Sequence, residues 1–206
     1  MKNVYQLIVI TLFILVSMDQ AYSQVRLGAK AGLNMAKVNY DEVFETETKF
    51  LPTFMVGGVV EFDFSESLSL GTGLQYHGKG AKSKEEDDVK VTLGYIQVPL
   101  QLQFRSNGFF GAVGPYAAFA ISGKSIDGDD EEDIEFGSGE EDDWSALDVG
   151  VNAEIGYEFN KLRLTASYSA GLSNGIPKDQ QDFFEDAKIT NAVIGIALTY
   201  LFTGVE

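Results

Sequence analysis

Nine charged residues lie in segments in which apolar and other residues alternate, and each falls on the less apolar side of this alternation. A period of two is the spacing of side chains on one face of a β-strand. Charges withdrawn from water must be paired, and the four cations among them nearly match the five carboxylates. The pattern therefore predicts a salt-bridge network enclosed by strands, made of Arg26, Lys30, Glu61, Asp63, Arg105, Asp148, Glu154, Glu158 and Arg163.

The positions of these charges along the segments predict two layers. The layer near the ends joined by short turns is expected to contain Arg26, Asp63, Arg105, Glu158 and Arg163. The layer nearer the middle is expected to contain Lys30, Glu61 and Glu154. We interpret the network as structural, and a gated ion path is the functional alternative.

A second group of residues that could do chemistry is the acidic segment 123–143, in which Lys124 is the only basic residue. Dense carboxylates are hard ligands suited to calcium or magnesium, but the Asp-x-Asp-x-Asp-Gly pattern of a calcium loop is absent. We interpret the segment as a solvated, self-repelling loop, with docking of a basic partner as one alternative. Weak binding of a divalent cation is the other, and its candidates are Asp127, Asp129, Asp130, Glu131 and Asp133.

A Ser-His-acid arrangement would have to use the only histidine, His77, with Ser83 or Ser122 as nucleophile and a nearby acid. No nucleophile elbow surrounds these serines. The sequence also contains no cysteine, phosphate-binding loop, dinucleotide fingerprint or metal-spaced histidines. We therefore expect no enzyme and no cofactor, and we predict that His77 lines the interior of a barrel near its outer mouth.

The elements that must position these residues are strands, because apolar residues recur with a period of two from residue 25 onward. Short connections (65–67, 106–108, 160–161) alternate with long polar ones (39–52, 79–91, 123–143, 173–188). Outer-membrane barrels show this alternation of tight turns and long exterior loops. The eight predicted strands are 25–38, 54–64, 68–78, 95–105, 109–122, 147–159, 162–172 and 191–202.

The sizes of the side chains predict which face of each strand meets lipid. One face carries large apolar residues, whereas the other carries charges together with many glycines and alanines. An eight-stranded barrel has an interior just wide enough for side chains, so the small and polar face should point inward. Aromatic residues gather towards both ends of the apolar faces, as in the girdles of membrane barrels. The sequence thus predicts an all-β fold, an eight-stranded antiparallel up-and-down transmembrane β-barrel.

The N-terminus carries the pattern of a secretory signal peptide. Lys2 precedes an apolar run over 4–18, and Ala21 and Ser23 form a small-x-small cleavage motif. An N-terminal membrane anchor is the alternative, but a span needs roughly 20 apolar residues and this run is shorter. We predict a signal peptide over 1–23 and an exported barrel over 24–206.

Composition restricts the partners. The chain has 206 residues, a length that suits one domain, with 31 acidic against 15 basic residues and a formal charge of −16. This balance argues against nucleic acid, whose phosphates require clustered Lys and Arg.

Four segments resemble the small outer-membrane β-barrel domains, labelled "porin family" or PorT-like, of Bacteroidota: GAKAGLN (28–34), YIQVPLQLQF (95–104), GPYAAFAISG (114–123) and DVGVNAEIGYEF (148–159). The resemblance covers nearly all of the chain after residue 23. It implies a protein of the bacterial outer membrane, and PorT-like members are associated with secretion and gliding machinery. Tyr200-Leu201-Phe202 is similar to the aromatic C-terminal signal of outer-membrane proteins, although Thr203–Glu206 follow it.

These observations together predict a monomer in outer-membrane lipid, inserted by the barrel-assembly machinery. We expect a non-enzymatic protein without an open pore that displays acidic extracellular loops in a structural, adhesive or accessory role. Its surface partner is not specified by the sequence. The alternatives are an outer-membrane enzyme acting on lipid or peptide, a secretion or gliding accessory barrel, and a soluble secreted ligand-binding barrel.

Overall fold

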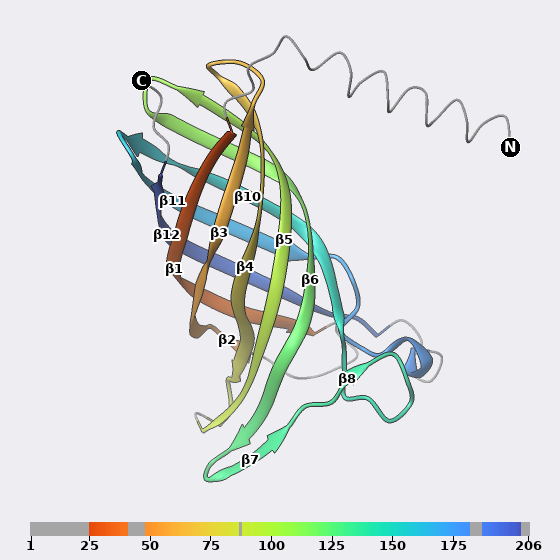
Figure 1. Cartoon of the computed structure of the whole chain (residues 1–206). Helices are drawn as coiled ribbons and strands as arrows, with labels where there is room; N and C mark the ends of the chain where they lie inside the picture. Colours follow the sequence, from red (N-terminus) through yellow and green to blue (C-terminus); the bar gives the residue numbers. More distant parts are fainter. Residues whose placement is uncertain (1–24, 41–47, 87, 182–186, 203–206) are drawn as a thin grey trace, which may run out of the picture.

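Eight long antiparallel strands form the body of the molecule in a computed structural model, which describes residues 25–40, 48–86, 88–181 and 187–202. Figure 1 shows these strands wrapped around a common axis. They are β1 (Val25–Tyr40), β3 (Leu51–Asp63), β4 (Leu68–Ser83), β5 (Val89–Ser106), β6 (Phe109–Asp127), β10 (Leu147–Phe159), β11 (Leu162–Gly171) and β12 (Ile189–Leu201).

The sheet closes on itself. Each of these strands pairs with the next one along the chain, and β12 pairs with β1 from Gly28↔Leu201 to Tyr40↔Ile189. The strand β6 pairs directly with β10, across the segment that separates them in the sequence. Closure leaves no unpaired edge in the barrel wall, so the predicted eight-stranded antiparallel barrel is confirmed.

Short turns lie at one end of the barrel and long connections at the other, which we call the short-turn end and the long-loop end. The short turn between β5 and β6 is Asn107-Gly108, with φ of 49° and 83°, a pairing of positive φ values that suits tight hairpins. The long-loop end, at the bottom of Figure 1, carries the small elements. They are β2 (Thr48–Lys49), β7 (Asp130–Asp133), β8 (Phe136–Gly137), β9 (Trp144–Ser145) and the 3-10 turn η2 (Lys178–Gln180).

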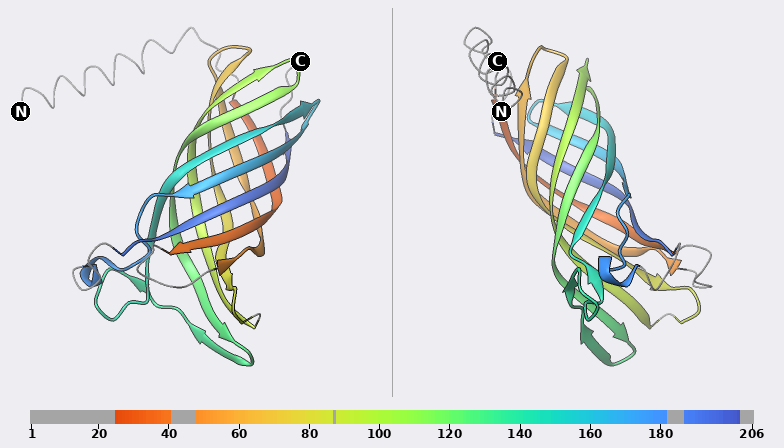
Figure 2. Two further views of the ribbon diagram at one scale, coloured as in Figure 1. Left: turned by 180° about the vertical axis from the view of Figure 1, so that it is seen from behind. Right: turned by 90° about the vertical axis from the view of Figure 1, so that its right-hand side faces the viewer.

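The wall of the barrel is taller on one side than the sequence predicts. The connections 79–91 and 123–143, expected to be loops, are strand over much of their length, because β4 runs to Ser83, β5 begins at Val89 and β6 runs to Asp127. Continued pairing, from Gly78↔Gly94 to Lys82↔Lys90, satisfies backbone groups that a loop would leave to water. The two views in Figure 2 show this raised wall, extended by β7, on one side of the long-loop end.

The outside of the barrel is apolar and the inside is polar. Large outward side chains such as Leu33 (74 % exposed) and Ile155 (62 % exposed) form a continuous surface around the wall, while Arg26 and Glu61 are buried inside. Aromatic residues occupy exposed positions near both ends of this surface, among them Phe104, Tyr157 and Phe159 at the short-turn end and Phe54, Phe119 and Tyr168 towards the other.

No helix in the described ranges has the length and hydropathy needed to cross a membrane. The predicted signal peptide over 1–23 lies outside the described residues.

Candidate functional site

The candidate site is the barrel interior, where alternation along the strands directs the charged side chains. Each inward position is two residues from the next, so the apolar outer surface forces Arg26, Lys30 and their counterparts on the other strands into the lumen. A charge in this confined space has to be paired with a group on a neighbouring strand or on the opposite side of the barrel.

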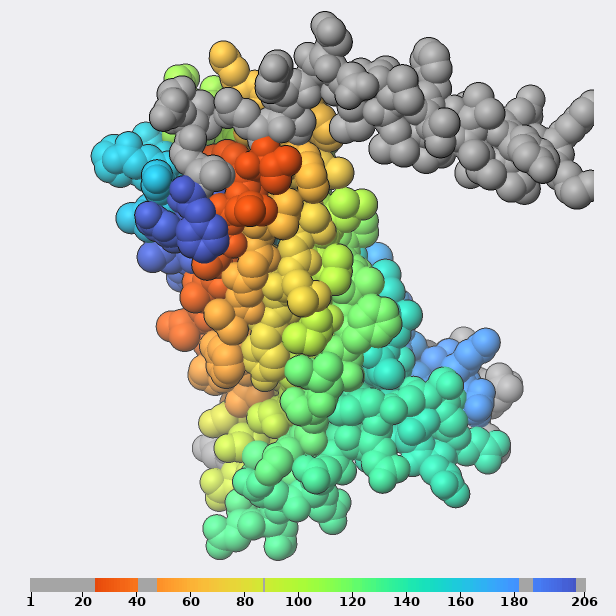
Figure 3. Space-filling view, in the orientation of Figure 1, coloured from red at the N-terminus to blue at the C-terminus, as the bar shows by residue number. Residues whose placement is uncertain are grey.

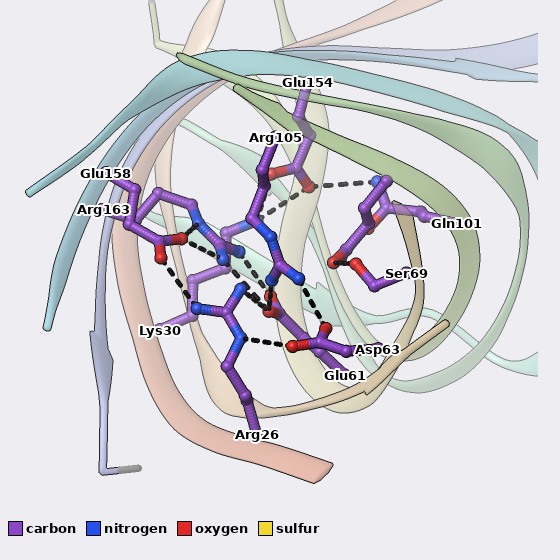
Figure 4. Close-up of polar contacts among 11 residues, drawn as sticks. Arg26, Lys30, Glu61, Asp63, Ser69, Gln101, Arg105, Glu154, Glu158 and Arg163 are labelled. Atoms are coloured by element: carbon purple, nitrogen blue, oxygen red, sulfur yellow. Dashed lines mark hydrogen bonds and ion pairs between the residues drawn. The ribbon is translucent and has the colours of Figure 1, made fainter. Parts of the chain in front are cut away.

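Six residues from five strands form one connected cluster at the short-turn end (Figure 4). We call it the short-turn cluster, and its members are Arg26, Glu61, Asp63, Arg105, Glu158 and Arg163. Three guanidinium groups face three carboxylates, so the formal charges cancel.

Glu61 is the hub of this cluster, because all three arginines contact it. Arg26 Nη2 donates to Glu61 Oε2 at 2.5 Å, Arg105 Nη1 donates to the same oxygen at 3.2 Å, and Arg163 Nη1 donates to Oε1. The outer contacts close the ring: Arg26 to Glu158 at 2.7 Å, Arg163 to Glu158 at 2.5 Å and Arg105 to Asp63 at 2.6 Å. The guanidinium of Arg163 also lies 3.9 Å from the centre of the Phe110 ring, in cation–π contact.

The prediction that Glu61 belongs to a middle layer is wrong. Glu61 is the direct cross-strand partner of Arg26, and the two share one face of neighbouring strands. This pairing places the Glu61 carboxylate among the arginines and leaves the middle of the barrel to the pair Lys30–Glu154.

The middle of the interior holds one ion pair and a set of amide and hydroxyl groups. Lys30 Nζ donates to both carboxylate oxygens of Glu154, at 2.7 and 2.8 Å. Gln101 donates to Glu154 at 3.3 Å and to Asn152 at 2.5 Å, and Asn152 in turn donates to Ser169 at 2.7 Å. Buried polar groups are therefore linked across β1, β5, β10 and β11.

A further ion pair near the long-loop end joins Asp148 to Lys79, which the sequence analysis placed in a loop. Lys79 Nζ donates to Asp148 Oδ2 at 2.8 Å and lies 4.9 and 4.5 Å from the ring centres of Tyr95 and Tyr116. Asn191 donates to the same carboxylate at 2.9 Å. The signal that could have found Lys79 is the period of two, which continues from Gln75 and His77 through Lys79.

An apolar cluster covers this pair towards the long-loop end, and we call it the apolar plug. Trp144, the only tryptophan of the chain, is contributed by the segment between β7 and β10 and is 8 % exposed. Ile134, Phe136 and Ile189 pack against the cluster. The plug consists of Val38, Ala81, Leu93, Tyr95, Tyr116, Ala118 and Trp144.

His77 lies in the interior, where its Nε2 is 3.2 Å from Gln75 Oε1. Ser83 caps the turn after β4 by accepting hydrogen bonds from the amides of Glu85 and Glu86, and Ser122 lines a groove on the outer wall. Neither serine is therefore aligned with the histidine.

The candidate cation ligands Asp127, Asp129, Asp130, Glu131 and Asp133 lie on and around the hairpin of β6 and β7. Glu131 is paired with Lys124 at 2.7 Å on the surface. In the part of the chain that the structure describes, no three His, Asp or Glu side chains are grouped so that they could hold a metal ion.

A closed eight-stranded barrel with an apolar exterior and a charged, packed interior defines the class of outer-membrane β-barrels. The profile of the family "Outer membrane protein beta-barrel domain" matches residues 18–176, which is more than half of the chain, and the chain belongs to this family. No curated protein matches the chain.

Two solved structures share the fold. Neisserial surface protein A (NspA) is 10 % identical with a TM-score of 0.53, and the match covers 84 % of this chain and 96 % of that one. Ail, the attachment invasion locus protein of Yersinia pestis, is 13 % identical with a TM-score of 0.50, covering 86 % of this chain and 98 % of that one. At these identities the similarity shows the fold alone.

Proposed function

We propose that this outer-membrane barrel is a non-enzymatic protein without an open pore, which holds a rigid acidic cap at the cell surface. The observation that carries the proposal is that side chains in mutual contact cross the described interior at both ends, in the short-turn cluster and in the apolar plug. The cavity of about 810 Å³ at the short-turn end lies against the short-turn cluster, which includes Arg26, Asp63, Arg105 and Glu158. Eight-stranded barrels leave room inside only for side chains, and aqueous channels accompany about 16 strands.

The cap is formed by segments that are hydrogen-bonded to one another. The amide of Ser145 donates to Gly175 O and the amide of Gly175 donates to Ile189 O, both at 2.8 Å. The side chain of Gln180 donates to Glu140 O and Asp142 O, at 3.0 and 2.6 Å. These links join the two connections that flank β10 and β11, and they support a fixed presentation of the surrounding carboxylates.

This arrangement supports a role at the cell surface that is structural, adhesive or accessory to another protein complex. The proposal includes export by the signal peptide over 1–23, insertion by the barrel-assembly machinery and residence as a monomer, because a closed wall offers no strand edge for pairing. A histidine-dependent enzyme is disfavoured by the contact of His77 with Gln75. Full activity of a His77→Ala variant in any lipase or peptidase assay would exclude it.

Conductance across a planar bilayer tests the absence of a pore. Wild-type protein should insert, as judged by migration that changes on boiling in SDS, and should give no steady single-channel current. A sixteen-stranded porin provides the positive control. A reproducible open level for the wild-type protein would contradict the proposal.

Labelling of intact cells tests the orientation, and the chain is suited to it because it has no cysteine. A membrane-impermeant maleimide should react with Glu132→Cys on β7 and should not react with Ser67→Cys in a short turn. Both positions are exposed, so the pair is matched. The reverse result would place the acidic cap in the periplasm.

A further inference from the structure

The outward face of β3, β4, β5 and β6 changes its chemistry just beyond the aromatic residues at the long-loop end. Figure 3 views this face, in orange to green. On β5 the outward residues from Phe104 to Ile96 are all apolar, and the next three outward positions are Gly94, Thr92 and Lys90. This boundary is where the hydrocarbon of the membrane should give way to lipid headgroups.

A groove with a volume of about 310 Å³ lies at this boundary. Gly78 and Gly94, which are direct cross-strand partners, lie at its floor. The stacked rings of Phe54 and Tyr76, with centres 5.0 Å apart, form an aromatic wall. A Cβ at Gly94 would lie 2.5 Å from Ser122 Oγ and 3.0 Å from Tyr76 Oη. Only glycine at this position therefore leaves room for the two hydroxyl groups next to the backbone of β5. Thr92 and Lys124 complete the polar side of the groove.

Four lysines continue this face above the groove, and we call them the lysine belt. Cross-strand partners share a face of a sheet, and Lys82 is the partner of both Lys49 and Lys90. Lys124 is the partner of Thr92, which is on the same face as Lys90. The same face carries Asp133, the cross-strand partner of Lys124, and Glu131. The four lysines outnumber these two carboxylates, so in a chain of formal charge −16 this face is charge-complementary to an anion at the membrane surface.

The distance of the lysine belt from the apolar boundary indicates which kind of lipid headgroup can reach it. Thr92, and with it Lys124, lies four residues beyond Ile96, about 13 Å along the strand and about 10 Å along the axis at a tilt of about 40°. The interfacial layer of an ordinary phospholipid is only about 5–7 Å deep on each side. A headgroup that also contains sugar rings reaches this level.

We propose that the groove and the lysine belt bind the phosphorylated sugar headgroup of an outer-leaflet glycolipid. The apolar face of a sugar ring packs on Tyr76 and Phe54, its hydroxyls meet Ser122 and Thr92, and its phosphate is neutralised by the lysines, which bind phosphate as point charges. The site uses the outward orientation of the long-loop end proposed above, but it is separate from the barrel interior.

Glu131 competes with this ligand. Its carboxylate is paired with Lys124 at 2.7 Å, on the same surface. A bound phosphate has to share Lys124 with Glu131, so removal of the carboxylate should tighten binding.

The experiment is a titration of the folded full-length protein in detergent with a diphosphorylated diglucosamine lipid, read by native mass spectrometry. The dephosphorylated lipid and phosphatidylglycerol are the comparison probes. Lys82→Gln/Lys90→Gln/Lys124→Gln should raise the Kd for the diphosphorylated lipid at least tenfold, and Glu131→Gln should lower it. The matched control Lys161→Gln/Lys178→Gln/Lys188→Gln removes the same charge elsewhere and should change the Kd less than twofold.

A second pair of variants tests the groove itself. Ser122→Phe places a ring in the groove and should weaken binding of the diphosphorylated lipid at least fivefold. Ile121→Phe adds a ring at the adjacent exposed position outside the groove lining and should leave binding unchanged. A shift on boiling in SDS verifies that each variant is folded. Equal affinity for the phosphorylated and dephosphorylated lipids, or equal loss in the belt and control variants, would overturn the proposal. These outcomes leave the conductance and labelling results untouched.

Discussion

The two ends of the barrel interior are held together by different chemistry. At the short-turn end, three arginines and three carboxylates satisfy one another, and Arg26 and Glu61 are almost completely buried. At the long-loop end, aliphatic and aromatic side chains cover a single ion pair, Lys79–Asp148. The stability of the short-turn end depends on the presence of every charge, whereas the stability of the long-loop end depends on the volume that apolar side chains fill. The two ends should therefore respond differently to substitution.

The largest effect is expected for Glu61→Ala. Removal of the hub leaves three guanidinium groups without their shared carboxylate, and breaking a buried ion pair from one side costs about 3–5 kcal/mol. Urea unfolding in lipid vesicles, followed by loss of resistance to SDS, measures the change. Glu66→Ala in the exposed turn is the matched control and should stay within about 0.5 kcal/mol of wild type. A similar small loss for Glu61→Ala would show that the charges do not act as one unit.

Trp144→Ala should lower the free energy of unfolding by about 3 kcal/mol, which is less than the largest loss expected for Glu61→Ala. This value is at the low end of the range for removing a large aromatic side chain from a packed cluster. The damage should stay local, because Trp144 belongs to a connection and the barrel wall does not include it. Hydrogen exchange should accelerate in 134–146 and 172–176 while the amides of β1 and β12 stay protected. Uniformly faster exchange around the wall would contradict a separate plug.

The ion pair beneath the plug should show non-additivity. Lys79→Met alone leaves Asp148 buried with only neutral donors such as Asn191 and should lower the free energy of unfolding by about 2 kcal/mol. The double variant Lys79→Met/Asp148→Asn removes both charges and should recover at least half of that loss. Additive losses in the double-variant cycle would mean that the two side chains act independently.

The smallest effect is expected for the exposed pair Lys124–Glu131. The hydrogen bond from Lys124 lowers the pKa of Glu131, so any stabilisation is present at neutral pH and is lost as the pH falls through the range in which Glu131 becomes protonated. Both side chains are about half exposed to solvent, and water screens such pairs. The Tm of Glu131→Gln should be indistinguishable from wild type at pH 7. A clear decrease would show that surface charges hold the raised wall together.

The sequence predicted the fold because alternation and loop length are local properties. Inward and outward positions of Arg26, Gln101 and Glu154 follow from a period of two, and Asn107-Gly108 marks a turn. The layer of Glu61 was misplaced because it depends on the register between β1 and β3. The strand position of Lys79 is not evident from the sequence, because a segment rich in glycine, lysine and carboxylates is typical of a loop, and it is pairing with β5 that extends β4. Nothing periodic marks Trp144, whose position is set by contacts with distant strands.

The balance of charge inside the barrel has an electrical consequence. Five cations and five carboxylates pair within the lumen, so the whole formal surplus of −16 belongs to the rest of the chain. Most of the remaining acidic residues lie in segments that join strands at the long-loop end. The molecule therefore carries its net negative charge mainly at one end of the barrel. Neighbouring copies with the same orientation repel one another through these like charges at low ionic strength, which would space them apart in the plane of the membrane, and approaching cationic proteins would be accelerated by the same field.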